Sequence, residues 1–198
     1  MSKPRTQQQR REAATQSVLE SACFLFGEQG YQGTSLECIA DRAGMTIRPI
    51  YHYFGNKEQL FLAVTEQMEQ RLYAAMQEIE AGQNGPVLGQ YWEVFMQFGR
   101  DPQFRQIVLV DAPVVLGRER WADSPVVQQV IDILVPLFPG LLPETRHLIA
   151  QMVIAALTEV AMSLAEPGNK GKEHAFEEIS GLIRMVLESV PGGFAASL

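Results

Sequence analysis

Apolar residues recur every three or four positions along most of the chain, which is the spacing of amphipathic α-helices. The alternation of apolar and polar residues that marks a β-strand does not appear, and no segment repeats. We therefore expect an all-α fold. The pattern predicts long helices over residues 10–29, 57–81, 86–98, 144–165 and 172–190, with further helices beginning at Asp101 and Ser124.

Two short helices interrupt this series of long ones. Thr34 is expected to open the first, with a glutamate three residues later in the spacing of a capping box. Gly44 follows where a residue with positive φ would end that helix. Thr46 is expected to cap the second helix, and Pro49 falls in its first turn, where a missing N–H costs little. Two helices joined by a short turn with a glycine form a helix-turn-helix, whose second helix enters the major groove of DNA.

The helix from Lys57 to about Ala81 is predicted to begin at an Asn56 cap and to span about 35 Å at about 1.5 Å per residue. It leads from the first part of the chain into the rest, so any tilt of this helix would move the first part. Farther on, Pro113 is expected to break or kink the helix that begins at Asp101.

The helix-turn-helix segment closely resembles the DNA-binding domain of the tetracycline-repressor (TetR/AcrR) family of transcriptional regulators. The matching residues are TS-x-x-x-IA-x-x-AG from Thr34, IYHYF from Ile50 and NKEQL from Asn56. The resemblance covers Arg10 to about Leu62, and several fixed spacings match in one run. Pro49 departs from the family, which usually has a small residue or glycine there, and it stiffens the entry of the recognition helix.

The resemblance implies a three-helix DNA-binding domain at residues 1–57 and a helical ligand-binding and dimerisation domain at residues 58–198. It implies a homodimeric repressor that a small molecule releases from a palindromic DNA operator. The expected DNA contacts are Thr34, Thr46, Ile47, Arg48, Pro49, Tyr51, His52, Tyr53 and Lys57.

Individual roles within this set stay open. Arg48 can read a guanine with two donors or hold a phosphate, and Thr46 and Lys57 suit phosphates at helix starts. The two tyrosines reach backbone oxygens or belong to the core, and His52 is either a contact or a packing residue. Residues 1–9 are a frayed terminus or an arm that lies along the phosphates or enters the minor groove.

Two further sites follow from the resemblance and from the apolar residues of the later helices. The resemblance implies a ligand pocket, and bulky apolar groups with a few polar partners would suit a small molecule there, although each residue also fits an ordinary core. Its residues are Trp92, Phe95, Met96, Phe104, Val108, Asp111 and Trp121. The helix at 144–165 is apolar nearly all round, so one side is expected to meet a second copy of the chain. The interface residues are Met152, Ala156, Val160, Ile179, Ile183 and Val186.

Composition agrees with a folded regulatory protein. The chain of 198 residues is 46% hydrophobic and carries a net charge of −7. Residues 1–57 hold seven Lys or Arg and five Asp or Glu, a balance of +2 that leaves −9 for the rest. An acidic body (residues 58–198) with a basic head (residues 1–57) suits a protein that touches DNA at one end. Cys23 and Cys38 are expected to be free, buried thiols, and with no signal peptide or membrane-length apolar run we expect a cytoplasmic protein.

Catalytic chemistry has little support in the sequence. Glu144 and His147 have the Glu-x-x-His spacing of di-iron bundles, but no second copy of the motif accompanies them. No nucleophile elbow, phosphate-binding loop or zinc-ligand motif occurs. We therefore expect no enzyme activity, no cofactor and no metal. The alternative hypothesis is an all-helical small-molecule-binding or adaptor protein whose helix-turn-helix has lost DNA reading.

Overall fold

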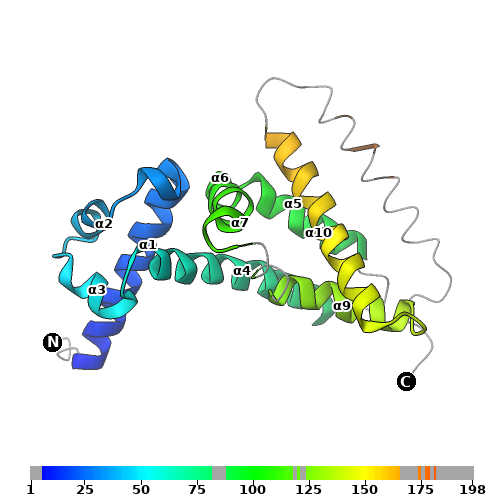
Figure 1. Cartoon of the computed structure of the whole chain (residues 1–198), viewed down its shortest axis with the longest axis horizontal. Coiled ribbons are helices and arrows are strands. Elements are labelled where there is room, and N and C mark those ends of the chain that lie inside the picture. The colour runs from blue at the N-terminus through cyan, green and yellow to red at the C-terminus, as the bar shows by residue number, and fades with distance from the viewer. Residues whose placement is uncertain are drawn as a thin grey trace. The chain divides into compact units, whose positions relative to one another are not determined.

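The computed structural model describes residues 6–81, 88–117, 120 and 124–165, with isolated positions at 174, 177, 178 and 181 (Figure 1). Across these residues every regular element is a helix, which confirms the all-α prediction. In chain order the elements are α1 (Gln7–Gly33), α2 (Leu36–Arg42), α3 (Arg48–Phe54), α4 (Lys57–Ala81), α5 (Leu88–Arg100), α6 (Pro102–Phe104), the π-helix η1 (Arg105–Asp111), α7 (Ala112–Val115), α9 (Pro125–Leu137) and α10 (Pro143–Ala165).

Polar side chains cap the long helices at their first residues. Thr6 and Gln9 form a reciprocal capping box at the start of α1, three residues earlier than the sequence predicted. Asn56 Oδ1 accepts a hydrogen bond from the Gln59 N–H at 2.8 Å, so α4 begins where it was expected. Ser124 caps α9 by accepting the N–H three residues on. Each cap satisfies a backbone donor that has no partner within its helix.

The chain divides into two compact units, neither of which is continuous in sequence. The first comprises Met1–Met68 and Pro102–Gly117, and the second comprises Glu69–Asp101 and Arg118–Leu198. Helix α4 therefore contributes its first half to one unit and its second half to the other. The domain boundary that the sequence suggested between residues 57 and 58 differs from this division and remains a prediction.

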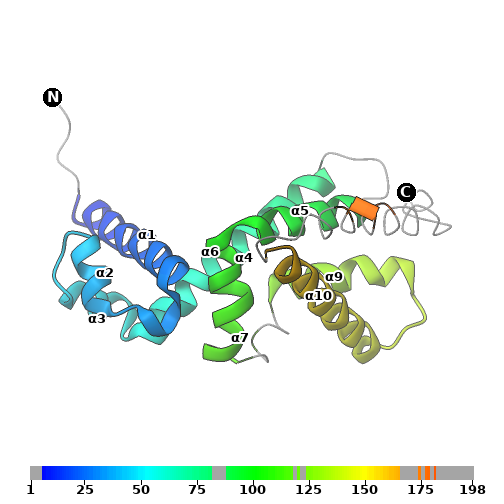
Figure 2. The same cartoon turned by 90° about the horizontal axis from the view of Figure 1, so that it is seen from above.

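In the first unit, α1, α2 and α3 gather around one small core beside the start of α4 (Figure 2). Every helix contributes fully buried apolar side chains, among them Phe26 of α1, Ile39 of α2, Ile50 of α3 and Phe61 of α4. The rings of Phe26 and Phe61 meet edge to face with their centroids 5.0 Å apart. Because a core this small supplies limited stability, each of these contacts matters for the position of α3.

The segment at residues 102–115 stays helical throughout and packs against α1 through α6 and η1. The expectation of a break at Pro113 was wrong, whereas a kink there stays a prediction. Pro113 lies in the first turn of α7, immediately after the seven-residue π-helix. The wider π turn changes the hydrogen-bond register before the proline, so the missing N–H does not interrupt the helix.

In the second unit, α10 packs against both α5 and α9. Gly99 of α5 lies so close to α10 that a Cβ at this position would come within 2.8 Å of the Ala161 Cβ. The pair of small residues allows the two helices to approach closely, and Phe95 and Met96 are buried nearby in sequence on α5.

One side of α10 stays uncovered in the single chain. Met152 is 71% exposed and Leu148 is 60% exposed, and Ala156 is also exposed, whereas Val160 is half-buried. The expected helix at 172–190 lies outside the described residues apart from the four isolated positions, and so do Ile179, Ile183 and Val186. Only the α10 half of the expected interface is therefore described.

The two cysteines are free, but the expectation that both are buried was wrong. Cys38 is exposed and Cys23 is half-buried. Cys38 lies on the solvent side of α2, since the buried side of that helix carries Leu36, Ile39 and Ala40.

Candidate functional site

The turn between α2 and α3 has the geometry of a helix-turn-helix. The side chain of Ser35 caps α2 by accepting the Cys38 N–H at 3.2 Å. Gly44 adopts φ 68°, the conformation that glycine enters without a Cβ clash. The next N–H, of Met45, donates to the Ala40 carbonyl at 3.0 Å and closes the turn against α2.

Two expected caps were wrong. Ser35 rather than Thr34 caps α2, because the hydroxyl of Thr34 instead donates to the carbonyls of Leu25 and Gly30 at 3.1 and 2.9 Å. Thr46 does not cap α3, which begins after Ile47 without a side-chain cap hydrogen bond. Pro49 does lie in the first turn of α3, as predicted.

Helix α3 presents polar side chains on one side and buries its apolar side. Ile50 is fully buried, and Phe54 is half-buried. Tyr51 is 51% exposed, and Arg48 and His52 are also exposed. Thr46 is exposed ahead of the helix, while the expected contacts Ile47, Pro49 and Tyr53 are half-buried.

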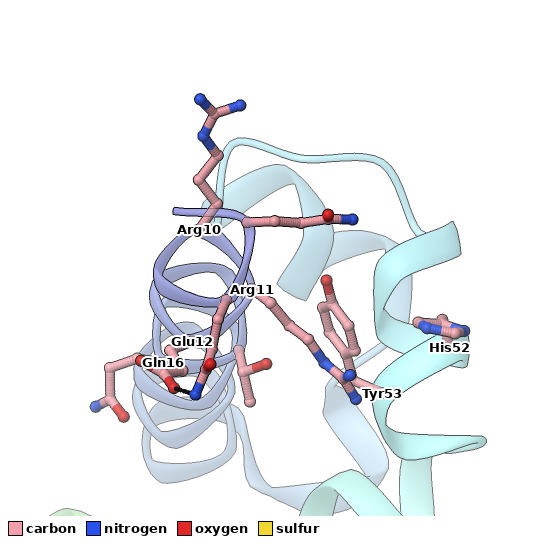
Figure 3. A pocket seen from close by; sticks show the side chains of 9 residues that line it. Arg10, Arg11, Glu12, Gln16, His52 and Tyr53 are labelled. Carbon is pink, nitrogen blue, oxygen red and sulfur yellow. Dashed lines mark hydrogen bonds between the residues drawn. The ribbon is translucent and has the colours of Figure 1, made fainter. Parts of the chain in front are cut away.

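An open polar groove of about 1200 Å³ lies between the start of α1 and the end of α3 (Figure 3). The Arg11 guanidinium lies 5.6 Å from the centroid of the Tyr53 ring, a cation–π contact that joins the two helices. Arg10 lines the same groove and is exposed. The side chains that line it are Gln7, Gln8, Arg10, Arg11, Glu12, Thr15, Gln16, His52 and Tyr53. Neither Arg10 nor Arg11 was among the contacts expected from the sequence, although two adjacent arginines near a helix start were the available signal.

Two expected contacts, Thr34 and Lys57, are engaged inside the fold. Thr34 is only 2% exposed. Lys57 Nζ donates to the carbonyls of Tyr31 and Thr34, each at 3.0 Å, and lies 4.1 Å above the Tyr31 ring. Burial, and then the Glu58 carboxylate, raise the pKa of the Tyr31 hydroxyl. The two residues fix the corner between α1 and α2, and Thr34 drops out of the candidate contacts.

The expected pocket residues are buried apolar side chains that divide between the two units. Trp92, Phe95 and Met96 belong to the second unit, and Phe104 and Val108 belong to the first. Trp121 lies outside the described residues. Asp111 makes a hydrogen bond within the fold, in which its Oδ2 accepts the Tyr31 N–H at 2.7 Å. Binding of a small molecule by these residues therefore remains a prediction.

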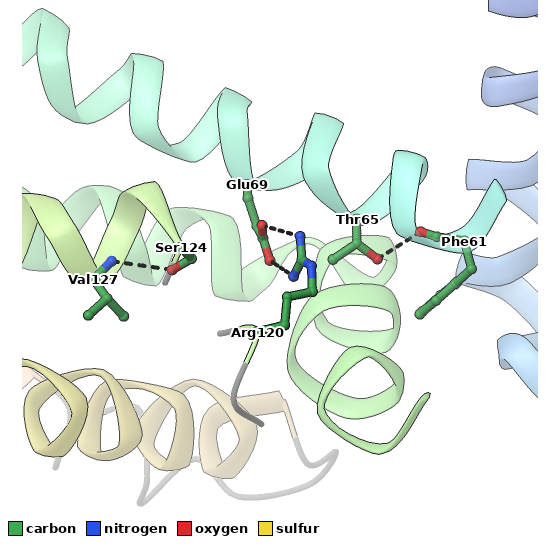
Figure 4. Close-up of polar contacts among 6 residues, drawn as sticks. All are labelled: Phe61, Thr65, Glu69, Arg120, Ser124 and Val127. Atoms are coloured by element: carbon green, nitrogen blue, oxygen red, sulfur yellow. Dashed lines mark hydrogen bonds and ion pairs between the residues drawn. The ribbon is translucent and has the colours of Figure 1, made fainter. Parts of the chain in front are cut away.

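A buried ion pair in the second unit was not anticipated from the sequence (Figure 4). Both oxygens of Glu69 accept from the two terminal nitrogens of Arg120 at 2.7 Å. The side chain of Glu69 is 3% exposed and that of Arg120 is 21% exposed. Bidentate pairing compensates a carboxylate that burial alone would destabilise.

Neither a metal site nor a membrane span occurs in the part of the chain that the structure describes. No group of three or more His, Cys, Asp or Glu is placed to hold a metal ion there. No described helix is long and apolar enough to cross a membrane.

Two family models match the chain, one over its N-terminal part and one over its C-terminal part. Residues 18–64 match the model for bacterial regulatory proteins of the tetR family, and residues 87–190 match that for the tetracyclin repressor-like C-terminal domain. The chain belongs to the TetR family. The first match covers the α1–α4 region that holds the helix-turn-helix, so the resemblance stated from the sequence is confirmed.

Relatives of this TetR-family chain include named repressors. It is 30% identical over 100 residues to the HTH-type transcriptional repressor AcnR of Corynebacterium efficiens, covering 46% of this chain and 53% of AcnR. It is 37% identical over 65 residues to the HTH-type transcriptional repressor NicS of Pseudomonas putida, covering 33% of this chain and 29% of NicS. The chain thus spans about half of AcnR and less than a third of NicS.

Solved structures share the fold over nearly the whole TetR-family chain. A TetR-family transcriptional regulator from Pectobacterium atrosepticum matches with a TM-score of 0.68 at 22% identity, covering 94% of this chain and 97% of that one. A regulator from Shewanella sp. PV-4 matches with a TM-score of 0.69 at 18% identity, covering 88% and 96%. At these identities the likeness concerns the fold alone.

Replacing Lys57 tests whether its ammonium group stabilises the folded state. Lys57→Met should lower the free energy of unfolding by about 1–3 kcal/mol, because two carbonyls lose a charged donor. Urea denaturation measures the change, with Arg71→Met as the control because Arg71 is exposed on the same helix. Equal stability of the two variants would contradict the assignment and leave Lys57 free for a phosphate.

Removing Glu69 should destabilise the second unit by leaving Arg120 without its carboxylate. We expect Glu69→Ala to cost about 3 kcal/mol, at the low end of buried pairs because Arg120 keeps some contact with water. Urea denaturation at one fixed protein concentration gives the value, since a dimer would link stability to concentration. Glu66→Ala is the matched control at an exposed position of α4, and a similar loss in both variants would refute the prediction.

Proposed function

We propose that this TetR-family protein is a homodimeric, DNA-binding transcriptional repressor that a small-molecule effector releases from a palindromic operator. The observation that carries the proposal is the two-sided character of α3. Ile50 anchors the helix in the core of the head, while Arg48, Tyr51 and His52 are exposed on its other side. A short helix that is buried by one side and polar on the other fits a recognition helix in the major groove.

Arg48 has the strongest chemistry for base reading on this helix. It is exposed in the first turn of α3, and a guanidinium can donate two hydrogen bonds to the O6 and N7 of guanine. The exposed hydroxyls of Thr46 and Tyr51 lie on either side of it in the sequence and suit phosphate oxygens, which position a protein without reading sequence.

The groove beside α3 extends the proposed contact along the DNA backbone. Arg10 and Arg11 place two cations at the start of α1, and both line the open groove that His52 and Tyr53 of α3 also line. Arginine contacts to phosphates release counterions and supply the part of the affinity that does not depend on sequence. We therefore add Arg10 and Arg11 to the proposed contacts.

The uncovered side of α10 supports the proposed dimer. Leu148, Met152 and Ala156 are exposed apolar residues at helical spacing, and a second copy of α10 would remove them from water. A dimer gives two copies of α3, and heads about 34–36 Å apart, or a multiple of that distance, would match the half-sites of a palindrome. A protein with this role works where the chromosome is, in the cytoplasm.

The effector is proposed to act through unequal affinity for two dimer states. A molecule bound among the helices of residues 58–198 shifts the population only if it binds the released state more tightly than the DNA-bound state. Helix α4 links the units covalently, since its first half belongs to one and its second half to the other.

Binding to the DNA upstream of the protein's own gene is the first test of this function. A gel shift at low salt should show a complex that an excess of unrelated duplex does not displace. Complete absence of binding at low salt would contradict the proposal and favour the alternative of an adaptor that has lost DNA reading.

Arg48→Ala should weaken binding to the preferred duplex by about 1–3 kcal/mol, because the bidentate contact to a base is lost. Fluorescence anisotropy with the labelled duplex measures the change. Arg71→Ala removes the same charge from an exposed position of α4 and serves as the control. Equal affinities of the two variants would remove Arg48 from the site.

Replacing both Arg10 and Arg11 with alanine should act on phosphate binding rather than on base reading. The slope of log K against log salt should fall in magnitude by about 0.9 for each phosphate contact that is lost. Preferred and unrelated duplexes should weaken alike. The double variant Gln7→Ala and Gln16→Ala changes neutral residues of the same groove, and a slope no lower for the arginine variant than for this control would contradict the assignment.

A further inference from the structure

The end of α1 is held by a carboxylate that lies 80 residues away in the sequence. Gly30 interrupts the helix with φ 70° and ψ 170°, which takes the next N–H, that of Tyr31, out of the helical hydrogen-bond series. Asp111 Oδ2 accepts this N–H at 2.7 Å and also accepts from Gln106 Nε2 at 3.1 Å. A hydrogen bond to an ionised acceptor is stronger than one between neutral groups.

The carbonyl of the same residue, Tyr31, is held by the first residue of α4. Lys57 Nζ donates to the Tyr31 carbonyl at 3.0 Å, so the N–H of Tyr31 is held by Asp111 and its C=O by Lys57. The Tyr31 ring meets the Phe61 ring of α4 with centroids 5.0 Å apart. Tyr31 therefore joins η1, the end of α1 and the start of α4.

A second contact, one turn earlier on α1, fixes the segment 102–117 to the head. A Cβ on Gly27 would come within 2.7 Å of Gln103 Cγ and 2.9 Å of Gln103 Cβ. With a glycine at this position, α6 approaches the α1 backbone directly. Gly27 and Tyr31 thus give the segment two adjacent points of attachment on α1.

Residues 102–117 connect the two units along the chain. Residues 102–117 pack in the first unit, but the residues on both sides of them, through Asp101 and from Arg118, belong to the second unit. The segment is therefore joined to the second unit along the chain at both of its ends. Asp111 is the last residue of the π-helix η1. Rewinding π to α would turn the residues beyond it by about 100°, the rotation of one α-helical residue.

We propose that Asp111 is a positioning residue for DNA binding: its carboxylate, placed by η1, fixes the α1–α2 corner and so the head that carries α3. This inference rests on the function proposed above. It gives Asp111 a different role from the ligand contact expected from the sequence. Without the carboxylate the corner samples more conformations, and DNA binding must then select the competent one, which weakens the apparent affinity.

Two substitutions separate the hydrogen bond from the charge. Asp111→Ala removes both, whereas Asp111→Asn removes the charge and keeps an oxygen that can accept the Tyr31 N–H. Asp132→Ala is the matched control, because Asp132 is exposed on α9 and also accepts from a glutamine side chain, that of Gln128 at 2.8 Å. Removing a negative charge would by itself reduce repulsion of the DNA and strengthen binding. A weaker affinity therefore cannot be caused by a change in that repulsion.

Hydrogen exchange followed by mass spectrometry measures how well the amides of the α1–α2 corner are protected. Fluorescence anisotropy measures the affinity for the upstream duplex and for an unrelated duplex. In Asp111→Ala the amides of residues 27–34 should exchange faster. Affinity for the upstream duplex should fall about tenfold, equivalent to about 1.4 kcal/mol, with no fall for the unrelated duplex. Asp111→Asn should lie nearer to the wild type in both measurements, and Asp132→Ala should match it.

The remaining outcomes overturn the proposal in distinguishable ways. Faster exchange with unchanged affinity for the upstream duplex would make Asp111 a local brace without influence on DNA binding. Unchanged exchange would show that the corner does not depend on this carboxylate. If the wild type bound neither duplex, the proposed function would fail and the positioning role with it, whatever the exchange measurement gave.

Discussion

The position of α3 depends on the hydrophobic core that α1, α2, α3 and the start of α4 share. Ile50 is the one residue of α3 that is fully buried, and it meets a core that includes Phe26, Ile39 and Phe61. A seven-residue helix has too few backbone hydrogen bonds to be stable alone, so this packing supplies most of its stability. Because the apolar side is turned inward, the polar residues of α3 are exposed, and the proposed function follows from that orientation.

Such a small core makes the helices around it sensitive to contacts at its edges. The corner at Tyr31 gathers several of these contacts, with Asp111 on the N–H, Lys57 on the carbonyl and aromatic rings beneath. The segment that supplies Asp111 comes from the far side of α5 in the sequence, yet it packs with the head. The head therefore packs with residues 102–117 and is not an independent module of about fifty residues.

Local signals in the sequence were enough to predict the elements that depend on neighbouring residues. The periodicity of apolar residues and the Asn56 cap gave both ends of α4, and Gly44 and Pro49 placed the helix-turn-helix. Thr34 and Ser35 are adjacent hydroxyl residues, and either could have capped α2. The choice was decided by the kink at Gly30, which brings carbonyls to the Thr34 hydroxyl.

The roles that the sequence missed all involve partners that are distant along the chain. Lys57 at a helix start suggested a phosphate contact, but its ammonium group donates hydrogen bonds to two carbonyls more than twenty residues away in the sequence. Asp111 among apolar residues suggested a ligand contact, and Glu69 in a long helix gave no signal of its pairing with Arg120. The π-helix has no pattern of its own in the sequence beyond the proline that follows it.

The most direct test of the central claim is a methylation-interference and hydroxyl-radical footprint of the full chain on the DNA upstream of its gene. The account predicts interference at guanine N7, which lies in the major groove, in two half-sites whose centres are about 10–10.5 base pairs apart or a multiple of that spacing. A footprint confined to the minor groove, or one in which N7 methylation has no effect, would contradict the assignment of α3 as the helix that reads DNA.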